Sequence, residues 1–227
     1  MKNKRYALIV AAGSGSRMGT DIPKQFLLLQ GKPVLMHTVE AFYNYDPEIQ
    51  IITILAPEHK EYWRDLCKKH KFRIKHLVVE GGATRFHSVK NGLAHVTDNA
   101  LVAIHDGVRP IIDRELLEAV FVVAEKGKAV YPVVSVVDTL RRWTDKGKHK
   151  TMDRSRFCLV QTPQVFSSRI LRRAYQTEYS ERYTDDISVV ESRRICRPVM
   201  VAGKRENIKI TTPVDLIIAE AILNQRK

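Results

Sequence analysis

Cysteine is scarce and scattered in this chain of 227 residues. The three cysteines, Cys67, Cys158 and Cys196, show no C-x-x-C spacing. Such an odd, widely separated set excludes a disulfide framework and a zinc ribbon, and it is typical of reduced thiols in the cytoplasm. Long hydrophobic runs are also missing, and the charged start of the chain leads directly into a strand pattern. We therefore expect a cytoplasmic protein with no signal peptide, no membrane span and no membrane partner.

Two common phosphate-binding patterns are absent as well. The Walker A sequence does not occur, and the third glycine of a possible G-x-G-x-x-G fingerprint falls one residue late. These absences exclude a P-loop ATPase and a standard dinucleotide-binding dehydrogenase. Nucleic-acid module motifs are lacking and aromatic residues make up only 7%, although the formal net charge is +13. We expect anionic small substrates and no nucleic acid; a basic nucleic-acid-binding protein or a non-catalytic nucleotide sensor is the alternative.

The most informative feature that is present is a glycine-rich turn near the N-terminus. An apolar run at Tyr6–Ala12, typical of a buried parallel strand, leads into Gly13, Gly15 and Gly19. Glycines allow a tight turn and let backbone N–H groups approach a ligand without an intervening Cβ. Two cations within eleven residues of Gly13 suit a polyanion such as a nucleoside triphosphate. The residues expected around it are Ala11, Ala12, Gly13, Ser14, Gly15, Arg17 and Lys24. The alternative is a turn that merely needs glycine.

Strands and helices alternate along most of the chain. With 44% hydrophobic and 28% charged residues, this rhythm predicts one α/β domain over residues 1–227, with a mostly parallel twisted sheet and helices on both faces. The expected strands are Tyr6–Ala12, Ile49–Leu55, Ile74–Val79, Leu101–His105, Ala129–Val137, Phe157–Gln161, Pro198–Val201 and Asn207–Ile210. The expected helices are 33–45, 58–70, 84–96, 113–126, 167–178, a short one after 184–186, and 212–224.

The alternation breaks between residues 138 and 157. Thr139–Trp143 and His149–Asp153, joined by a turn at Asp145–Lys148, have the pattern of a polar and basic hairpin. Such a hairpin has too few apolar residues to bury itself. We therefore predict an arm at about 138–157 that projects from the domain against a second subunit; an unpartnered surface hairpin is the alternative.

Polar residues follow directly after most of the predicted strands. Ligands of such sheets bind beyond the carboxyl ends of the strands, so we expect one site at that edge. The candidates there, besides the glycine turn, are Gly81, Gly82, Arg85, Ser88, Asp106, Arg109, Thr139, Thr162 and Lys209. Plainer interpretations exist, because glycine pairs are often turns, a lone aspartate often caps a helix, and most Lys and Arg side chains are solvated. His105 we interpret as structural.

Taken in order, these motifs resemble the 2-C-methyl-D-erythritol 4-phosphate cytidylyltransferase family. The chain carries A-A-G-S-G-S-R-M-G with P-K-Q, G-G-x-x-R-x-x-S, H-D-x-x-R-P, V-D-T, M-D-R before L-V-Q-T-P-Q, T-D-D and N-I-K-I-T. Each string alone is weak, but their order and spacing over nearly the whole length are specific. The resemblance implies a Rossmann-like nucleotidyltransferase domain that transfers CMP from CTP to methylerythritol phosphate. It also implies a homodimer whose arms exchange across the interface.

The resemblance further implies roles for individual residues. Gly82, Arg85 and Ser88 would hold cytosine and ribose, and the cations Arg17, Lys24 and Lys209 would stabilise the transferring phosphate. No catalytic base is expected, because a phosphate monoester with a second pKa of about 6 is already an anion near pH 7. Asp106 is the candidate for the nucleotide and its Mg²⁺, an ion that takes few protein ligands. The expected sugar-phosphate residues are Arg109, Thr139, Arg154, Thr162 and Thr184.

One motif departs from the family pattern. The family often has H-D-A-A-R-P, whereas residues 105–110 here read H-D-G-V-R-P. Related cytidylyltransferases that use ribitol 5-phosphate also carry an H-D-x-V-R-P form, so they are the alternative. The arginine of Met152–Arg154 favours the erythritol enzyme, because it stands where that family clamps its substrate phosphate.

Overall fold

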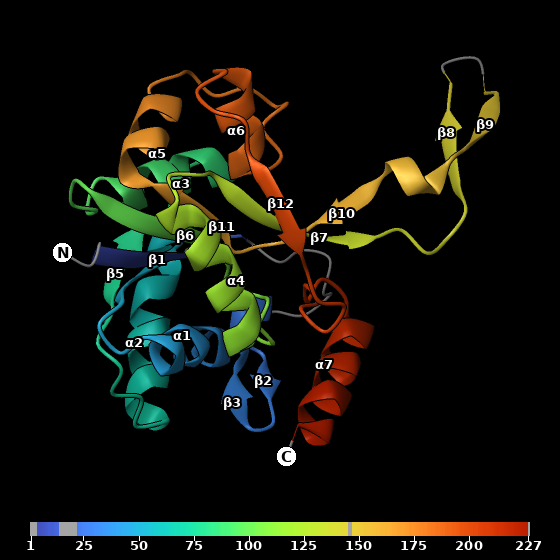
Figure 1. The fold of residues 1–227 in the computed structure, drawn as a ribbon. Helices are drawn as coiled ribbons and strands as arrows, with labels where there is room; N and C mark the ends of the chain where they lie inside the picture. The colour runs from blue at the N-terminus through green and yellow to red at the C-terminus, as the bar shows by residue number, and fades with distance from the viewer. Residues whose placement is uncertain (1–3, 14–21, 145–146, 227) are drawn as a thin grey trace.

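A mixed, mostly parallel sheet forms the centre of this α/β fold. The computed structural model describes residues 4–13, 22–144 and 147–226 (Figure 1). Eight strands run in the order β10-β7-β11-β6-β1-β4-β5, with β12 paired to β7 off this path. The central strand, β1, is parallel to both of its neighbours, β4 and β6. β11 and β10 are antiparallel to the strands that they join.

The elements have the following bounds. The sheet strands are β1 Lys4–Ala11, β4 Gln50–Leu55, β5 Leu77–Glu80, β6 Ala100–Asp106, β7 Val130–Ser135, β10 Cys158–Val160, β11 Gln164–Ser167 and β12 Val199–Ala202. Two small hairpins lie outside it, made of β2 Leu28–Leu29 with β3 Lys32–Pro33 and of β8 Leu140–Trp143 with β9 His149–Met152. The α-helices are α1 Val34–Tyr45, α2 Lys60–Lys69, α3 Arg85–Leu93, α4 Arg114–Glu125, α5 Ser168–Ala174, α6 Asp186–Ser192 and α7 Pro213–Gln225. Short 3-10 turns are η2 Lys24–Phe26, η3 Pro57–His59 and η4 Arg154–Arg156.

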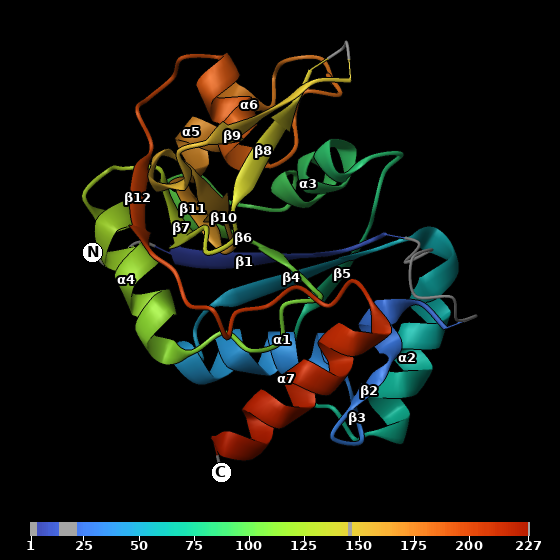
Figure 2. The same cartoon turned by 90° about the vertical axis from the view of Figure 1, so that its right-hand side faces the viewer.

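Helices cover both faces of the sheet, as predicted, because its central strand is apolar on both sides. In β1, Ala7 and Ile9 belong to the core beneath α1, α2 and α4. The alternate residues Tyr6 and Leu8 pack with α3, α5 and α6 on the other face. Successive side chains of a strand point to opposite faces, so a continuous apolar run produces this double burial. Figure 2 shows the two helix layers above and below the sheet.

Helix ends match their expected sequence signals. The Asp113 side chain accepts a hydrogen bond from the Leu116 N–H and so caps α4, while Gly127 follows that helix with φ +75°. Thr212 and Pro213 begin α7 through a capping box with Asp215. Both starts satisfy backbone N–H groups that the first turn of a helix leaves unpaired.

One predicted strand and several predicted boundaries differ from the structure. The prediction of a strand at Asn207–Ile210 is wrong: this segment is irregular, and the side chain of Asn207 anchors it by donating to the Thr162 carbonyl at 2.8 Å. The antiparallel strand β11 was not predicted. The strand expected from Ile74 begins at Leu77, and the helix expected over 167–178 and the strand expected over 129–137 end early, at Ala174 and Ser135.

The predicted hairpin projects from the body of the molecule. β8 and β9 pair in antiparallel register, with Leu140 opposite Met152 and Trp143 opposite His149. In Figure 1 the pair stands away from the sheet and its helices, connected through β7 and β10. Its Trp143 is 76% exposed. Across the described residues, none of the helices combines the length and the apolar character needed to span a membrane.

Candidate active site

A cleft of about 450 Å³ lies at the carboxyl edge of the sheet, where the sequence predicts the site. The ends of β1 and β6, the loop after β5, and the segment before α7 surround it. Parallel strands expose unpaired backbone groups and loop side chains at this edge, which is why α/β sheets bind ligands there. The lining includes the predicted residues Ala11, Ala12, Gly13, Lys24, Gly82, Arg85, Ser88, Asp106 and Lys209.

Gln25 fixes the loop that leaves β1, and the sequence analysis assigned it no role. Its side-chain amide donates to the carbonyls of Ala11 at 2.9 Å and Gly13 at 3.3 Å, and it is buried. A buried amide with two backbone acceptors stabilises one loop geometry. Its neighbour Lys24 thereby reaches the cleft lining. The predicted residues Ser14, Gly15 and Arg17 lie outside the described residues.

The glycine pair after β5 is required by close packing. A Cβ on Gly81 would come within 2.5 Å of the Ala12 Cβ, and one on Gly82 within 2.5 Å of the His87 Cβ. The Gly82 N–H donates to the Ser88 hydroxyl at 3.1 Å, and that hydroxyl donates to the Thr84 carbonyl. Gly81 therefore lets the β5 loop lie directly against the loop that follows β1, where a nucleotide was expected, and Gly82 lets it lie against α3.

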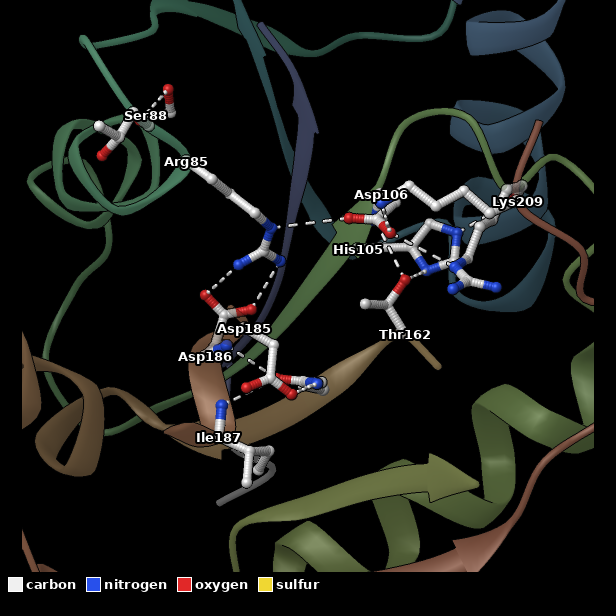
Figure 3. A network of polar contacts seen from close by, with 12 residues as sticks. Arg85, Ser88, His105, Asp106, Thr162, Asp185, Asp186, Ile187 and Lys209 are labelled. Atoms are coloured by element: carbon white, nitrogen blue, oxygen red, sulfur yellow. Dashed lines mark hydrogen bonds and ion pairs between the residues drawn. The ribbon is translucent and has the colours of Figure 1, made fainter. Parts of the chain in front are cut away.

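Three cations surround the carboxylate of Asp106 (Figure 3). Lys209 Nζ lies 3.0 Å and Arg109 Nε 3.4 Å from Oδ2, while Arg85 Nε lies 3.7 Å from Oδ1. Burial alone raises the pKa of Asp106, but the charges of Arg85, Lys209 and Arg109 outweigh it and hold that pKa well below its usual range. Asp106 is therefore ionised at neutral pH. Burial lowers the pKa of Arg109, and Arg85 lowers it further, against the opposing effect of Asp106.

His105 and Thr162 form the support behind Asp106. His105 Nε2 lies 3.0 Å from the Arg109 carbonyl, which can only accept, so Nε2 carries the proton. Nδ1 then accepts from the Thr162 hydroxyl at 3.0 Å, and that hydroxyl accepts from the Asp106 N–H at 3.1 Å. Burial lowers the pKa of His105 to about 4. A neutral, fully bonded imidazole matches the structural interpretation of His105.

Thr162 was expected to bind the sugar phosphate and Arg85 the cytosine and ribose, but both side chains make hydrogen bonds within the protein. Thr162 is buried, and its hydroxyl is already bonded on both sides, so it lies behind the cleft and holds Asp106. Both Nη atoms of Arg85 bind Asp186, and its Nε is the atom that lies beside Asp106, at 3.7 Å. Asp186 lies in the T-D-D motif but was not a sequence candidate, because 101 residues separate it from Arg85 and the motif does not indicate which residue it binds.

Two of the expected sugar-phosphate residues lie far from this cleft in the same subunit. Thr139 and Arg154 are exposed on the arm, where the Arg154 guanidinium donates to the Val137 carbonyl. Thr184 is exposed just before α6. Arg109, in contrast, lies beside Asp106 and donates to the Asn207 carbonyl at 2.7 Å. The structure thus brings the nucleotide candidates together and leaves the arm residues apart from them.

The cleft offers a divalent cation one carboxylate. Within the described part of the chain no group of three His, Cys, Asp or Glu side chains forms a metal site, and Asp106 is the one acidic residue among the described lining residues. Mg²⁺ prefers hard oxygen ligands, and when it arrives with a nucleotide it takes one or two carboxylates plus phosphates and water. An ionised Asp106 fits that donor set.

A larger groove of about 1170 Å³ lies at the opposite end of the strands. Its lining includes Tyr6 and Gln50 near the amino ends of β1 and β4, together with the loop 70–77. None of the predicted site residues lies there. Convergent charge and backbone N–H groups, rather than size, therefore distinguish the smaller cleft as the candidate active site.

Comparisons with known proteins agree on one family. The family profile of 2-C-methyl-D-erythritol 4-phosphate cytidylyltransferase matches residues 6–225. The chain is 55% identical over 224 residues to the protein of that name from Azobacteroides pseudotrichonymphae, covering 99% of this chain and 100% of the relative. It is 54% identical to the one from Bacteroides fragilis, covering 96% and 99%. The crystal structure of 4-diphosphocytidyl-2C-methyl-D-erythritol synthase from Anaerococcus prevotii superposes with a TM-score of 0.82 at 30% identity, covering 98% and 99%.

Proposed function

The chain belongs to the 2-C-methyl-D-erythritol 4-phosphate cytidylyltransferase family, and from this we infer how its cleft carries out the reaction of that family. The enzyme transfers CMP from CTP to 2-C-methyl-D-erythritol 4-phosphate. The products are 4-diphosphocytidyl-2-C-methyl-D-erythritol and pyrophosphate, in a step of isoprenoid precursor biosynthesis. The observation that carries the assignment to this site is the convergence of Lys24, Lys209, Arg85 and the glycine loops on one cleft.

The chemical step needs no base from the protein. An oxygen of the methylerythritol phosphate attacks the α-phosphorus of CTP, a new P–O bond forms, and the bond to the β-phosphate breaks to release pyrophosphate. The attacking phosphate, with a second pKa of about 6, is an anion near neutral pH. His105, next to the lining residue Asp106, has both ring nitrogens occupied and is buried. Its engagement supports a mechanism based on positioning and charge.

Cations in the cleft would stabilise the charge that develops on the α-phosphate. Lys24 and Lys209 enter the lining from opposite ends of the sequence, and Lys209 is already held by Asp106 at 3.0 Å. Phosphoryl transfers depend mainly on such positioned charges. Arg17 is proposed for the same role from its place in the glycine-rich motif. Gly13, Gly82 and Ser88 would hold the nucleotide beside them.

Mg²⁺ is the proposed metal, and Asp106 the residue that would hold it together with the CTP phosphates. Bound there, the ion would neutralise part of the triphosphate charge. The low pKa of Asp106 keeps its carboxylate available for this at neutral pH. Because Lys209 and Arg109 contact Oδ2, the less crowded Oδ1 is the atom we propose for the ion.

We propose a homodimer in which the arm of one subunit completes the partner's site. Thr139 and Arg154 belong to the arm, are exposed, and are not among the residues that line the cleft. Because the arm stands away from the sheet and its helices (Figure 1), we propose that they serve the sugar phosphate in another subunit. The arm and its base expose Trp143, Leu159 and Val160, and α7 exposes Val214 and Ile217. Figure 2 shows the arm and α7 on the same side of the molecule. Exposed apolar groups gathered on one side favour an interface there.

A pyrophosphate-release assay tests the function. Purified protein with CTP and Mg²⁺ should release pyrophosphate with methylerythritol phosphate and not with ribitol 5-phosphate. Release with ribitol 5-phosphate alone would reassign the substrate. If neither sugar phosphate supported release while the protein bound DNA or RNA in a salt-sensitive way, the enzymatic assignment would be wrong.

A further inference from the structure

The guanidinium of Arg85 is held at the side of the cleft by a carboxylate outside it. Arg85 is the first residue of α3, and its Nη1 and Nη2 bind the two carboxylate oxygens of Asp186 at 2.9 and 2.7 Å (Figure 3). A bidentate pair of this kind fixes the plane of the guanidinium as well as its position. With both Nη atoms occupied, Arg85 presents only Nε to Asp106, at 3.7 Å.

Asp186 is itself fixed from three directions. Its side chain is fully buried, and the Tyr175 hydroxyl donates to its Oδ1 at 2.6 Å. Its backbone N–H and that of Ile187 donate to the Gln164 side-chain carbonyl at 3.1 and 2.9 Å. The amide of Gln164 in turn donates to Asp185, the N-cap of α6. This network, anchored on β11 and α6, gives the carboxylate one position.

An unrestrained Arg85 would find a second partner in the cleft. Asp106 is the acidic residue in the described lining, and its Oδ1 is the oxygen nearest to Arg85. A guanidinium with free Nη atoms forms bidentate pairs with carboxylates readily. Such a pair would join the α3 side of the cleft to the end of β6, and it would occupy the oxygen that we assign to the nucleotide's metal.

We propose that Asp186 is a positioning residue for CTP binding, which binds both Nη atoms of Arg85, withholds them from Asp106 and so keeps the nucleotide cleft open. The proposal rests on the proposed function, since it assumes that CTP occupies this cleft. It differs from a purely electrostatic role. If Asp186 acted only through its charge, removing it would make the cleft more positive and would strengthen binding of a triphosphate.

The test measures KM and dissociation constants for CTP–Mg²⁺ in Asp186→Asn. We expect KM for CTP to rise about tenfold or more, with KM for methylerythritol phosphate changed less than threefold. Tyr175→Phe removes one hydrogen bond and leaves the ion pair, so its CTP constant should rise a few-fold. Asp46→Asn is the matched control, because Asp46 pairs with Arg5 at 3.3 Å near the amino end of β1, away from the cleft. Its CTP constants should stay at the wild-type value.

A double-mutant cycle separates positioning from stability. If Asp186 acts through Arg85, then Arg85→Gln with Asp186→Asn should bind CTP no more weakly than Arg85→Gln alone. Additive losses in the cycle would overturn the proposal, as would an unchanged or lower KM for CTP in a folded Asp186→Asn protein. Thermal unfolding identifies variants that do not fold. If Asp186→Asn does not fold, Tyr175→Phe decides, and an unchanged dissociation constant for CTP in that variant rejects the proposal. A wild-type protein that releases no pyrophosphate would instead reject the function on which this inference depends.

Discussion

The residues of this cleft form two groups, one that faces the open space and one that supports Asp106 from behind. Lys24 and Lys209 face the space that a nucleotide would occupy, whereas His105 and Thr162 are bonded behind Asp106. Both sets were recognisable from their place after strands, and His105 was interpreted as structural from the sequence. Thr162 was grouped with the substrate residues, because its hydrogen bonds and burial depend on neighbours that are distant in the chain.

Lys24→Ala should lower kcat strongly while the dissociation constant of CTP changes much less. The reason is that the proposed contact of this lysine with the α-phosphate would strengthen as charge develops in the transition state. We expect a loss in kcat of about 100-fold, by analogy with the removal of one oxyanion donor. Steady-state kinetics and equilibrium CTP binding measure the two quantities. Lys60→Ala is a suitable control, since Lys60 pairs with Glu80 at 2.8 Å outside the cleft. Equal losses in both quantities would contradict a transition-state role.

His105 should make the free energy of unfolding depend on pH between about 4 and 6.5. Its pKa is lowered by burial to about 4 in the folded protein, so in this window the unfolded chain binds more protons than the folded one. Stability is therefore full above pH 6.5 and falls as the pH drops towards 4. The loss is on the order of 3 kcal/mol for a shift of this size.

Urea unfolding of the wild type and of His105→Asn across this range checks the effect of the histidine. The variant should show a smaller decrease in unfolding free energy on going from pH 6.5 to pH 4.5 than the wild type shows. Parallel curves for the two proteins would mean that other groups produce the dependence.

At the scale of elements, two loops depend on one close contact. Gly81 packs its backbone against Ala12, and its N–H donates to the Leu55 carbonyl at 2.7 Å. The glycine pair was recognisable in the sequence as a turn or a site. The short distance between position 81 and the Ala12 Cβ, which makes glycine necessary there, arises only when the two loops have folded against each other and cannot be read from the sequence.

Gly81→Ala should destabilise the protein and weaken CTP binding together. Its new methyl group would lie 2.5 Å from the Ala12 Cβ and would push the β1 loop from its place. We expect a loss of about 1–3 kcal/mol in unfolding free energy, typical of overpacking. Gly13→Ala provides the control for stability, because no atom lies within 4 Å of a Cβ at that position. Similar melting temperatures for Gly81→Ala and the wild type would contradict the packing argument.

Element boundaries show where sequence patterns succeed and where they do not. β1, β4 and β6 are continuous apolar runs buried on both faces, and such runs are recognisable without a structure. Asn207–Ile210 has a strand-like alternation, but Asn207 is held by Thr162 instead of by a neighbouring strand. β11 has only four residues, and it joins the sheet by antiparallel pairing with β6. This pairing could not be predicted from the local sequence pattern.

The proposed exchange of arms places Arg154 of one subunit in the cleft of the other, and a mixed dimer tests this. Consider a heterodimer of one Arg154→Ala subunit and one Lys24→Ala subunit. If the arms exchange, the cleft of the Arg154→Ala subunit keeps its Lys24 and receives the intact Arg154 of its partner. The other cleft lacks both side chains. At low methylerythritol phosphate the heterodimer should show about half the wild-type activity, because one of two equivalent sites is complete. Both parental homodimers should be nearly inactive under these conditions.

Co-expression with two different affinity tags yields the heterodimer for this measurement. If the arm served the cleft of its own subunit, both sites of the heterodimer would be defective. A heterodimer no more active than its parents would therefore exclude exchange. Size-exclusion chromatography of the same samples checks that the wild type and the variants have equal mass in solution.

The exposed edge strand β10 makes refolding sensitive to aggregation. Leu159 is 55% and Val160 41% exposed, and β10 ends the described sheet with hydrogen-bonding partners only along β7. An open, apolar sheet edge of this kind templates aggregation when it stays uncovered. In the proposed homodimer a second copy would cover this edge, so dilution during refolding should lower the yield of folded protein.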